Sequence, residues 1–375
     1  MKPHSKTTPP VMKSPALSPP LPPVATPASE SPAEAPLAME SSVAALLASG
    51  KGILAADESL PTIGKRFAAL NIPSTEENRQ AYRELLFTVP ALGEFISGTI
   101  LFDETIRQTT SRGVSLPDCL TRQGIVPGIK VDKGTIALPG FSGEKATQGL
   151  DGLRERLAVY RGLGARFTKW RAVIAIGDGL PTAAGIEANA QALALFAALS
   201  QEAGLVPIVE PEVLMDGNHT IARCEAVATA TLRTVFATLC DHRVALEAML
   251  LKTAMVLPGK DSPQEAGVEE VAAATLRCLR RAVPAAVPGI VFLSGGQSEV
   301  VATGRLNAIC RAGGVPWKLS FSFGRALQDT AMRIWKGSPA ILAAAQAALR
   351  HRAKCNHLAV LGQYSEQAER EGSTR

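Results

Sequence analysis

The chain contains 375 residues, which is enough for a large hydrophobic core and one or two domains. Hydrophobic residues make up 46% and charged residues 19%, as in globular proteins, and the net charge of +5 follows no basic stripe, so composition predicts no nucleic-acid partner. No uncharged apolar run reaches the roughly 18 residues of a membrane span, so we expect no membrane association.

Residues 1–38 have the composition of a disordered tail. Eleven of the 26 prolines fall within residues 1–36, among Ser, Thr and Ala, and such a segment buries too little apolar surface to fold. It lacks the apolar stretch of a secretory signal. An organelle transit peptide is the alternative, because lysines precede the first acidic residue, Glu30, but the segment contains no arginine. We therefore expect a cytoplasmic protein with a folded region at 39–362 and a flexible tail at 363–375.

The cysteines and histidines predict neither a disulfide framework nor a metal site. The six cysteines lie far apart without a CxxC pair, and the five histidines show no HxxxH or HExxH spacing. We expect reduced thiols in a cytosolic setting, with no metal and no cofactor.

From residue 51 onward, short apolar runs alternate with amphipathic stretches of helical period. This alternation predicts an α/β fold, the (β/α)8 TIM barrel. An open, doubly wound sheet is the alternative, but it usually begins with a GxGxxG turn, and none follows the first run. The expected strands lie at residues 52–57, 96–102, 126–132, 167–176, 205–213, 248–256, 289–295 and 318–324. The expected helices lie at residues 75–87, 148–163, 186–203, 220–239, 263–283, 298–312, 325–335 and 340–354.

Charged side chains stand inside or at the end of most of these runs. In a barrel, catalytic groups come from the C-terminal ends of the strands, and side chains two residues apart on a strand face the same way. Each pair alone would be explained by a salt bridge at the rim, but buried charges need one another, so we expect a single cluster of mixed sign. Its expected members are Asp57, Lys130, Asp132, Lys169, Arg171, Glu210, Glu212 and Lys252.

Lys252 stands in the middle of the apolar run LLKTAMV at residues 250–256. A buried lysine tends to lose its proton and can then attack a carbonyl to form a Schiff base. The alternative is a lysine at a strand end whose ammonium group reaches water. We expect Lys169 and Arg171 to lower the pKa of Lys252 through their like charge, Glu210 and Glu212 to serve as general acid and base, and Asp57 to hold a hydroxyl or the lysine.

Two glycine-containing loops follow the last two expected strands, with sequences LSGGQS at 293–298 and SFSFGR at 320–325. Glycines allow backbone N–H groups to approach an anion, a helix begins directly afterwards, and barrels commonly bind phosphate at these two loops. A second anion site is expected at Thr62, Lys65, Arg66 and Lys130, with a solvated basic helix start as the alternative. In the first site, Arg325 could add a bidentate contact.

With these residues, the sequence resembles the class I fructose-bisphosphate aldolases, the metal-independent type that uses a Schiff base. The resemblance covers residues 50 to 364 in order. The matching stretches are GKGILAADES (50–59), TEENR (75–79), GIKVDKG (128–134), TQGLDGL (147–153), KWR (169–171), VPIVEPE (206–212), LLK (250–252), FLSGGQSE (292–299) and FSFGRAL (321–327).

The resemblance implies a role for each candidate residue in the cleavage of fructose 1,6-bisphosphate to dihydroxyacetone phosphate and glyceraldehyde 3-phosphate. Lys252 would form the Schiff base, Glu210 would transfer protons, and Asp57 would act at the C4 hydroxyl. Lys169, with Glu212 beside it, would stabilise charge. It also implies a homo-oligomer, usually a tetramer. The loops with Ser294 to Gly296 and Ser322 to Arg325 would hold one phosphate, and Thr62, Arg66, Lys130 and Arg171 would serve the rest of the substrate.

Three features depart from the family pattern, one of which is a short helix before Gly50 with the Pro-rich tail in place of the usual start. Thr253 and Ala254 follow Lys252 where Pro-Asn is usual, and the last tyrosine is Tyr364 in a chain that ends at Arg375. These departures keep two alternatives open: a Schiff-base aldolase for another sugar phosphate, and a catalytically silent barrel that serves as a scaffold.

Overall fold

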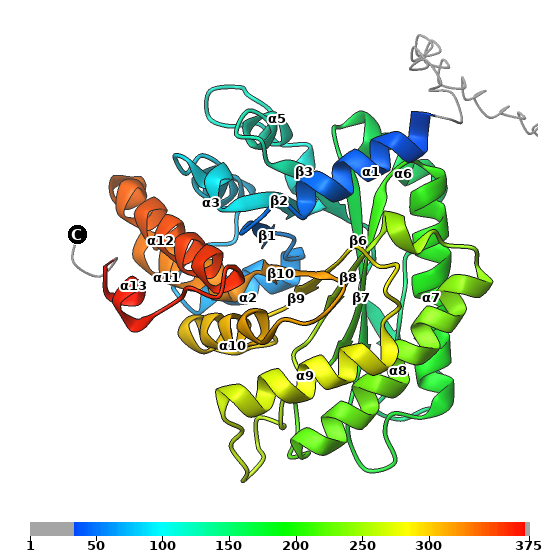
Figure 1. Cartoon of the computed structure of the whole chain (residues 1–375). Coiled ribbons are helices and arrows are strands. Elements are labelled where there is room, and N and C mark those ends of the chain that lie inside the picture. The colour runs from blue at the N-terminus through cyan, green and yellow to red at the C-terminus, as the bar shows by residue number, and fades with distance from the viewer. Residues whose placement is uncertain (1–33, 372–375) are drawn as a thin grey trace, which may run out of the picture.

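The computed structural model describes residues 34–371, so residues 1–33 of the expected N-terminal tail (1–38) lie outside the described part of the chain. Eight parallel strands close into a barrel with helices around it, which confirms the predicted fold class (Figure 1). The order around the barrel is β1-β10-β9-β8-β7-β6-β3-β2. The strands are β1 (Gly52–Ala55), β2 (Ile96–Leu101), β3 (Val126–Lys130), β4 (Thr135–Ala137), β5 (Lys145–Thr147), β6 (Phe167–Ile174), β7 (Val206–Val213), β8 (Leu250–Thr253), β9 (Gly289–Phe292) and β10 (Lys318–Phe323).

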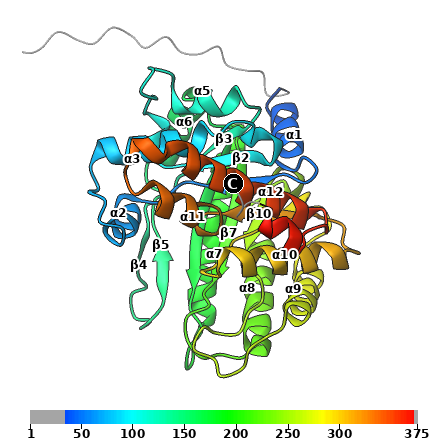
Figure 2. The ribbon, with the colours of Figure 1, turned by 90° about the vertical axis from the view of Figure 1, so that its left-hand side faces the viewer.

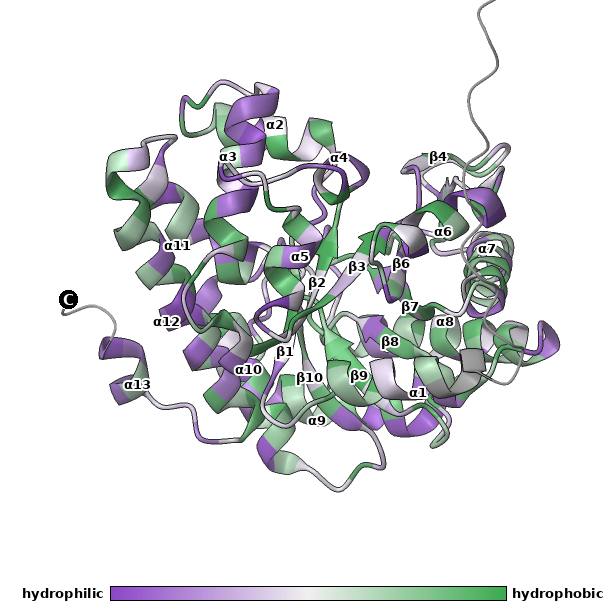
Figure 3. Cartoon of the chain, turned by 90° about the horizontal axis from the view of Figure 1, so that it is seen from above, coloured by the Kyte–Doolittle hydropathy of each residue, from purple (hydrophilic) through white to green (hydrophobic). Residues whose placement is uncertain are grey.

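The helices alternate with the strands and cover the outside of the barrel (Figure 3). No helix in residues 34–371 is long and apolar enough to cross a membrane. The helices are α1 (Glu34–Leu46), α2 (Leu60–Ala68), α3 (Glu76–Phe87), α4 (Asp103–Ile106), α5 (Leu116–Thr121), α6 (Leu153–Gly162), α7 (Ala183–Glu202), α8 (Ile221–Asp241), α9 (Val268–Ala282), α10 (Glu299–Ala312), α11 (Arg325–Trp335), α12 (Leu342–Val360) and α13 (Glu366–Arg370).

Every expected strand is present. The strands could be predicted because a strand that is buried on both faces appears in the sequence as a continuous apolar run. All residues of β2 and β7 are buried, for example. The antiparallel hairpin β4–β5 was not expected, since its strands are short and β4 is exposed. It stands beside the barrel in Figure 2. Helix α6 starts at Leu153 and not at residue 148, because Gly152 before it adopts a left-handed conformation with φ of 61°.

Helix α1 closes the N-terminal end of the barrel. Leu46, the last residue of this helix, and Leu47 directly after it pack in one cluster with inward-facing strand residues such as Ile53, Phe167 and Leu250. The ring of Phe167 fits there because a Cβ at Gly128 would stand 2.3 Å from it. The helix begins at residue 34, earlier than the expected domain boundary at 39. With this end filled by apolar side chains, polar groups can reach solvent from the barrel interior only at the opposite end.

The segment expected to be a flexible tail from residue 363 contains the short helix α13. Tyr364 donates a hydrogen bond of 2.6 Å from its hydroxyl to Glu369, and Glu369 also forms an ion pair with Arg352 on α12. These polar contacts fasten the described part of the C-terminal segment, up to residue 371, to the barrel.

Candidate active site

A cavity of about 1240 Å³ opens at the C-terminal ends of the strands. The closure of the barrel brings into it side chains from β1, β3, β6, β7 and β8 and from the loops after β9 and β10. Gly296 is the one predicted site residue that does not line it. The predicted residues that do are Asp57, Thr62, Lys65, Arg66, Lys130, Asp132, Lys169, Arg171, Glu210, Glu212, Lys252, Ser294, Gly295, Ser322, Gly324 and Arg325.

Four buried charges of alternating sign form the centre of this cavity. The ammonium nitrogen of Lys169 lies 2.7 Å from Asp57 Oδ2 and 3.2 Å from Glu210 Oε2, and the other oxygen of Glu210 lies 3.1 Å from Lys252 Nζ. The side chains of both lysines are at most 5% exposed. The alternative in which Lys252 reaches water at a strand end is therefore excluded. Two cations and two anions compensate one another, which is the condition for charges to persist in a barrel interior.

The electrostatics of the cluster follow from these contacts. Burial disfavours the charged form of Lys169, but the carboxylates of Asp57, Glu210 and Asp132 outweigh burial and raise its pKa. Burial likewise opposes ionisation of Asp57, yet Lys169 and Lys252 lower its pKa to about 2. Asp57 is therefore a carboxylate at neutral pH. Lys169 was expected to act on Lys252 as a neighbouring positive charge, but in the structure the carboxylate of Glu210 contacts both lysines.

Residues two apart on a strand do face the same way, as predicted. Lys169 and Arg171 of β6 both line the cavity, whereas Trp170 between them points outward and stacks on Phe196, with 5.6 Å between the ring centres. Arg171 pairs with Glu212 of the neighbouring strand at 2.5 Å and is 40% exposed, so this pair lies at the rim. Burial opposes the charge of Arg171, but Glu212 raises its pKa.

The loops after β9 and β10 present donors that lack acceptors. Gly295 has φ of 60°, a left-handed conformation that favours glycine. The hydroxyl oxygen of Ser322 is buried without a hydrogen-bond partner in the described structure. Arg325, the exposed first residue of α11, forms no ion pair or hydrogen bond within residues 34–371. Unpaired donors beside the N-terminus of a helix fit an anionic ligand.

The other basic patch is largely neutralised by carboxylates. Arg66 forms ion pairs with Glu58 and, at 2.9 Å, with Asp329. Lys130 pairs with the carboxylate of Asp132 and also donates to its backbone oxygen at 2.8 Å. Arg66 and Lys130 both line the cavity, as predicted, but an anionic ligand would have to compete with these carboxylates for the two cations.

Several lining residues were missed by the sequence analysis. Ser59 shares a hydrogen bond of 3.1 Å with Thr62, and it lies within the motif GKGILAADES, so the motif could have identified it. Arg156 and Tyr160 also line the cavity, but they belong to the ordinary amphipathic pattern of α6 and carry no sequence signal. A support behind the phosphate loop was also missed: Gln297 donates to the backbone oxygen of Ser294 at 2.9 Å.

The fold and the site together define a class of protein: a barrel enzyme with a buried lysine at its centre and donors for anionic substrates at the strand ends. The chain matches the sequence model of the class-I fructose-bisphosphate aldolases over residues 38–375. It therefore belongs to the class-I fructose-bisphosphate aldolase family, which is a family of lyases that act on phosphorylated sugars.

Individual relatives agree with this assignment. A probable fructose-bisphosphate aldolase class 1 of Xanthomonas axonopodis is 55% identical over 321 residues, which cover 85% of this chain and 96% of the relative. Fructose-bisphosphate aldolase 2 of Caenorhabditis elegans is 53% identical over 317 residues, covering 84% of this chain and 87% of the relative. The solved structure of fructose-bisphosphate aldolase from Plasmodium falciparum, in complex with TRAP and an inhibitor, superposes with a TM-score of 0.88 at 47% identity, covering 89% of this chain and 97% of that one.

Proposed function

We propose that this aldolase cleaves fructose 1,6-bisphosphate through a Schiff base on Lys252. The observation that carries the proposal is the contact between the buried Lys252 and Glu210, next to loops with unpaired donors for a phosphate. A protonated imine is an electron sink, so the C3–C4 bond can break and leave an enamine on the lysine.

Each member of the charge cluster has a role that fits its contacts. Lys252 passes a proton to Glu210, 3.1 Å from Nζ, and its amine then attacks the C2 carbonyl. Glu210 returns that proton to the carbinolamine hydroxyl, which leaves as water. Asp57, ionised at neutral pH, accepts the C4 hydroxyl proton as the C3–C4 bond breaks and that carbon becomes an aldehyde. Lys169 remains charged between the two carboxylates and offsets the negative charge that proton transfer shifts between them. Protonation of the enamine and hydrolysis of the imine then release dihydroxyacetone phosphate.

The order of the strands suggests which phosphate each patch serves. Strands β9 and β10 follow β8 around the barrel, so Ser294, Ser322 and Arg325 lie on the side of Lys252 and would bind the phosphate next to the C2 carbonyl. Thr62 after β1 and Lys130 at the end of β3 come from the opposite part of the ring and would meet the far phosphate. Arg171 and Glu212 at the rim would contact the middle of the chain.

The test is trapping of the imine. The protein is incubated with dihydroxyacetone phosphate and borohydride, and the intact mass and the peptide map are measured. One adduct per chain, located at Lys252 and absent from Lys252→Ala, is expected. A folded protein that gains no adduct, or gains it at another lysine, would contradict the proposal.

Another sugar phosphate is the alternative substrate, but Thr253, next to the reactive lysine, does not line the cavity and gives this alternative no support. A comparison of kcat/KM for fructose 1,6-bisphosphate and fructose 1-phosphate distinguishes the two substrates. A higher value for the monophosphate would show that the bisphosphate is not the preferred substrate.

We further propose that the protein is a cytoplasmic homotetramer. Relatives from Cicer arietinum and Pisum sativum are named cytoplasmic isozymes, which supports the location. Light scattering after size-exclusion chromatography measures the assembly, and a mass below that of four chains would contradict it.

A further inference from the structure

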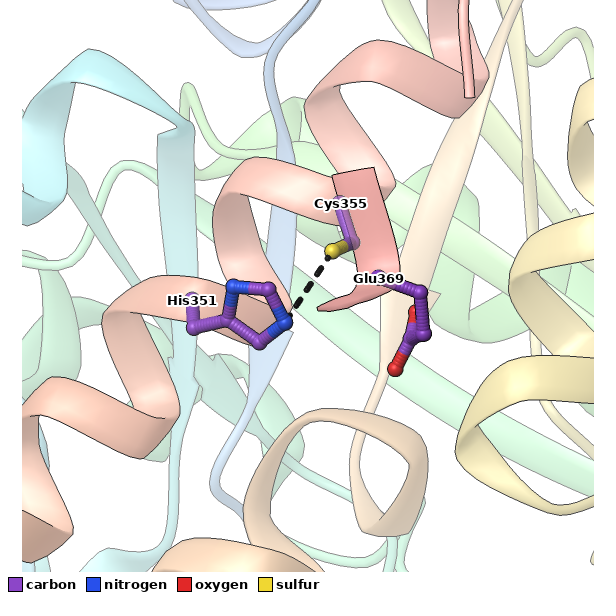
Figure 4. A group of neighbouring side chains, drawn as sticks. All are labelled: His351, Cys355 and Glu369. Atoms are coloured by element: carbon purple, nitrogen blue, oxygen red, sulfur yellow. Dashed lines mark hydrogen bonds between the residues drawn. The ribbon is translucent and has the colours of Figure 1, made fainter. Parts of the chain in front are cut away.

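A group of three side chains of different kinds lies away from the active-site cavity, between the last two helices. His351 and Cys355 come from successive turns of α12, and Glu369 comes from α13. Their ligand atoms all lie within 4.8 Å of one another. Figure 4 shows the imidazole of His351 facing the sulfur of Cys355, with Glu369 beside them. None of the three lines the cavity that contains Lys252.

We propose that His351, Cys355 and Glu369 form a binding site for a divalent, thiol-binding metal ion such as Zn²⁺. Imidazole, thiolate and carboxylate are the three side-chain ligands that this ion accepts. The proposal is independent of the aldolase reaction and would revise the expectation of no metal. Spacings between two histidines or between two cysteines do not reveal this site, because it combines one of each: His351 and Cys355 are four residues apart, which places them on one face of a helix.

The distances suit a tetrahedral ion. With metal–sulfur and metal–nitrogen bonds of roughly 2.3 and 2.0 Å, the two ligand atoms should lie about 3.5 Å apart. The Nε2 of His351 is 3.5 Å from the sulfur of Cys355. The carboxylate of Glu369 has to approach by roughly 1 Å, a movement that one side-chain rotation supplies. His351 is half-buried and Glu369 is 27% exposed, so water can fill the fourth position.

Neighbouring groups hold the carboxylate in the way that metal sites usually require. Arg352 pairs with one oxygen of Glu369, and Tyr364 donates to the other at 2.6 Å. A carboxylate oxygen has two lone pairs, so each can keep this partner and still bind the ion. Arg352 is fixed in turn by Thr303 at 2.7 Å. The thiol proton of Cys355 leaves to solvent on binding, and the thiolate and carboxylate together balance the charge of the dication.

The site would also strengthen the attachment of the short helix α13, which the ion pair between Glu369 and Arg352 already holds. Its five residues bury none of their side chains, so packing contributes little to its position. In the described structure, the thiol of Cys355 donates a weak hydrogen bond of 3.7 Å to the backbone oxygen of Ala368 on α13. A bound ion would replace that weak contact with two ligands from α12 and one from α13.

The experiment uses the full-length protein, treated with chelator and then titrated with Co²⁺, which replaces Zn²⁺ and reports its own ligands. A thiolate-to-cobalt charge-transfer band that saturates at one ion per chain is expected. Competition with Zn²⁺ should remove it. Cys355→Ser should abolish the charge-transfer band, and His351→Gln and Glu369→Gln should each weaken the affinity at least tenfold. Aldolase activity and circular dichroism of each variant establish that it is folded.

Cys240→Ser is the matched control, because Cys240 is an exposed thiol two residues from His242 and would account for adventitious binding. This variant should bind Co²⁺ as the parent does. Loss of the band in Cys240→Ser, its persistence in Cys355→Ser, or the absence of saturable binding would each overturn the proposal. If Cys355→Ser fails to fold, His351→Gln, whose side chain is only half-buried, decides: unchanged affinity would refute the site.

Discussion

The replacement of Arg325 by alanine tests the proposed phosphate site most directly. Within the described residues its guanidinium has neither a hydrogen-bond nor an ion-pair partner, so its removal leaves no carboxylate unpaired and should not affect folding. Arg66 is a less suitable choice, since its removal would leave Asp329 without its ion-pair partner and take one of two partners from Glu58. The effect of Arg325→Ala should therefore fall on binding alone.

The magnitude follows from the exposure of the side chain. Hydrogen bonds to charged groups contribute about 1.5–3 kcal/mol, and Arg325 is exposed before substrate binds, which favours the lower half of that range. A loss of about 1.5–2 kcal/mol corresponds to a roughly 10- to 30-fold increase in KM. The phosphate is bound in the ground state and in the transition state alike, so kcat should change little.

The assay compares steady-state cleavage of fructose 1,6-bisphosphate with borohydride trapping of dihydroxyacetone phosphate and of unphosphorylated dihydroxyacetone. The variant should lose affinity for the phosphorylated ketone and trap the unphosphorylated one like the parent. Arg333→Ala, on the same helix but outside the cavity, is the control. An unchanged KM, or an equal loss for both ketones, would remove Arg325 from the phosphate site.

Three further predictions concern the charges in and around the barrel mouth. Lys252→Ala should lose essentially all cleavage while its circular dichroism is retained, and substantial residual turnover would reject the imine mechanism. Asp57→Asn should be less stable than the parent to urea by about 2 kcal/mol at pH 7, because the pKa of Asp57 falls from 3.8 in the unfolded chain to about 2. A carboxyl group whose pKa is lowered by folding stabilises the folded protein at pH values above its pKa in the unfolded chain. The difference in unfolding free energy between parent and variant should therefore persist at pH 5 and shrink between about pH 4 and pH 2. A difference that stays constant over this range would contradict this cause. Glu58→Gln should cost about 3–5 kcal/mol in urea unfolding, because it leaves the buried Arg83 facing no carboxylate and removes one of the two carboxylates that pair with Arg66. Glu202→Gln, in an exposed pair, should have no measurable effect, and equal effects of the two substitutions would show that burial does not determine the cost.

Much of the candidate site could be read from the sequence because its signals are local. Successive side chains of a strand point to opposite faces, so Lys169 and Arg171 of β6 share one face and Trp170 lies on the other, whatever the tertiary contacts. The hairpin β4–β5 had no such signal, since its strands are too short and polar to show a period.

The sequence by itself determined which segments become strands, which end of each strand carries charge, and which family the motifs resemble, since all of these depend on residues close together in the chain. Tertiary structure decided the pairings. Closure of the barrel places Glu210 between Lys169 and Lys252, and the packing of α11 against α2 gives Arg66 the partner Asp329, 263 residues away. It also brings Glu369 to His351 and Cys355. Partners across the fold are chosen by the geometry of packing, and no local period of the chain encodes them.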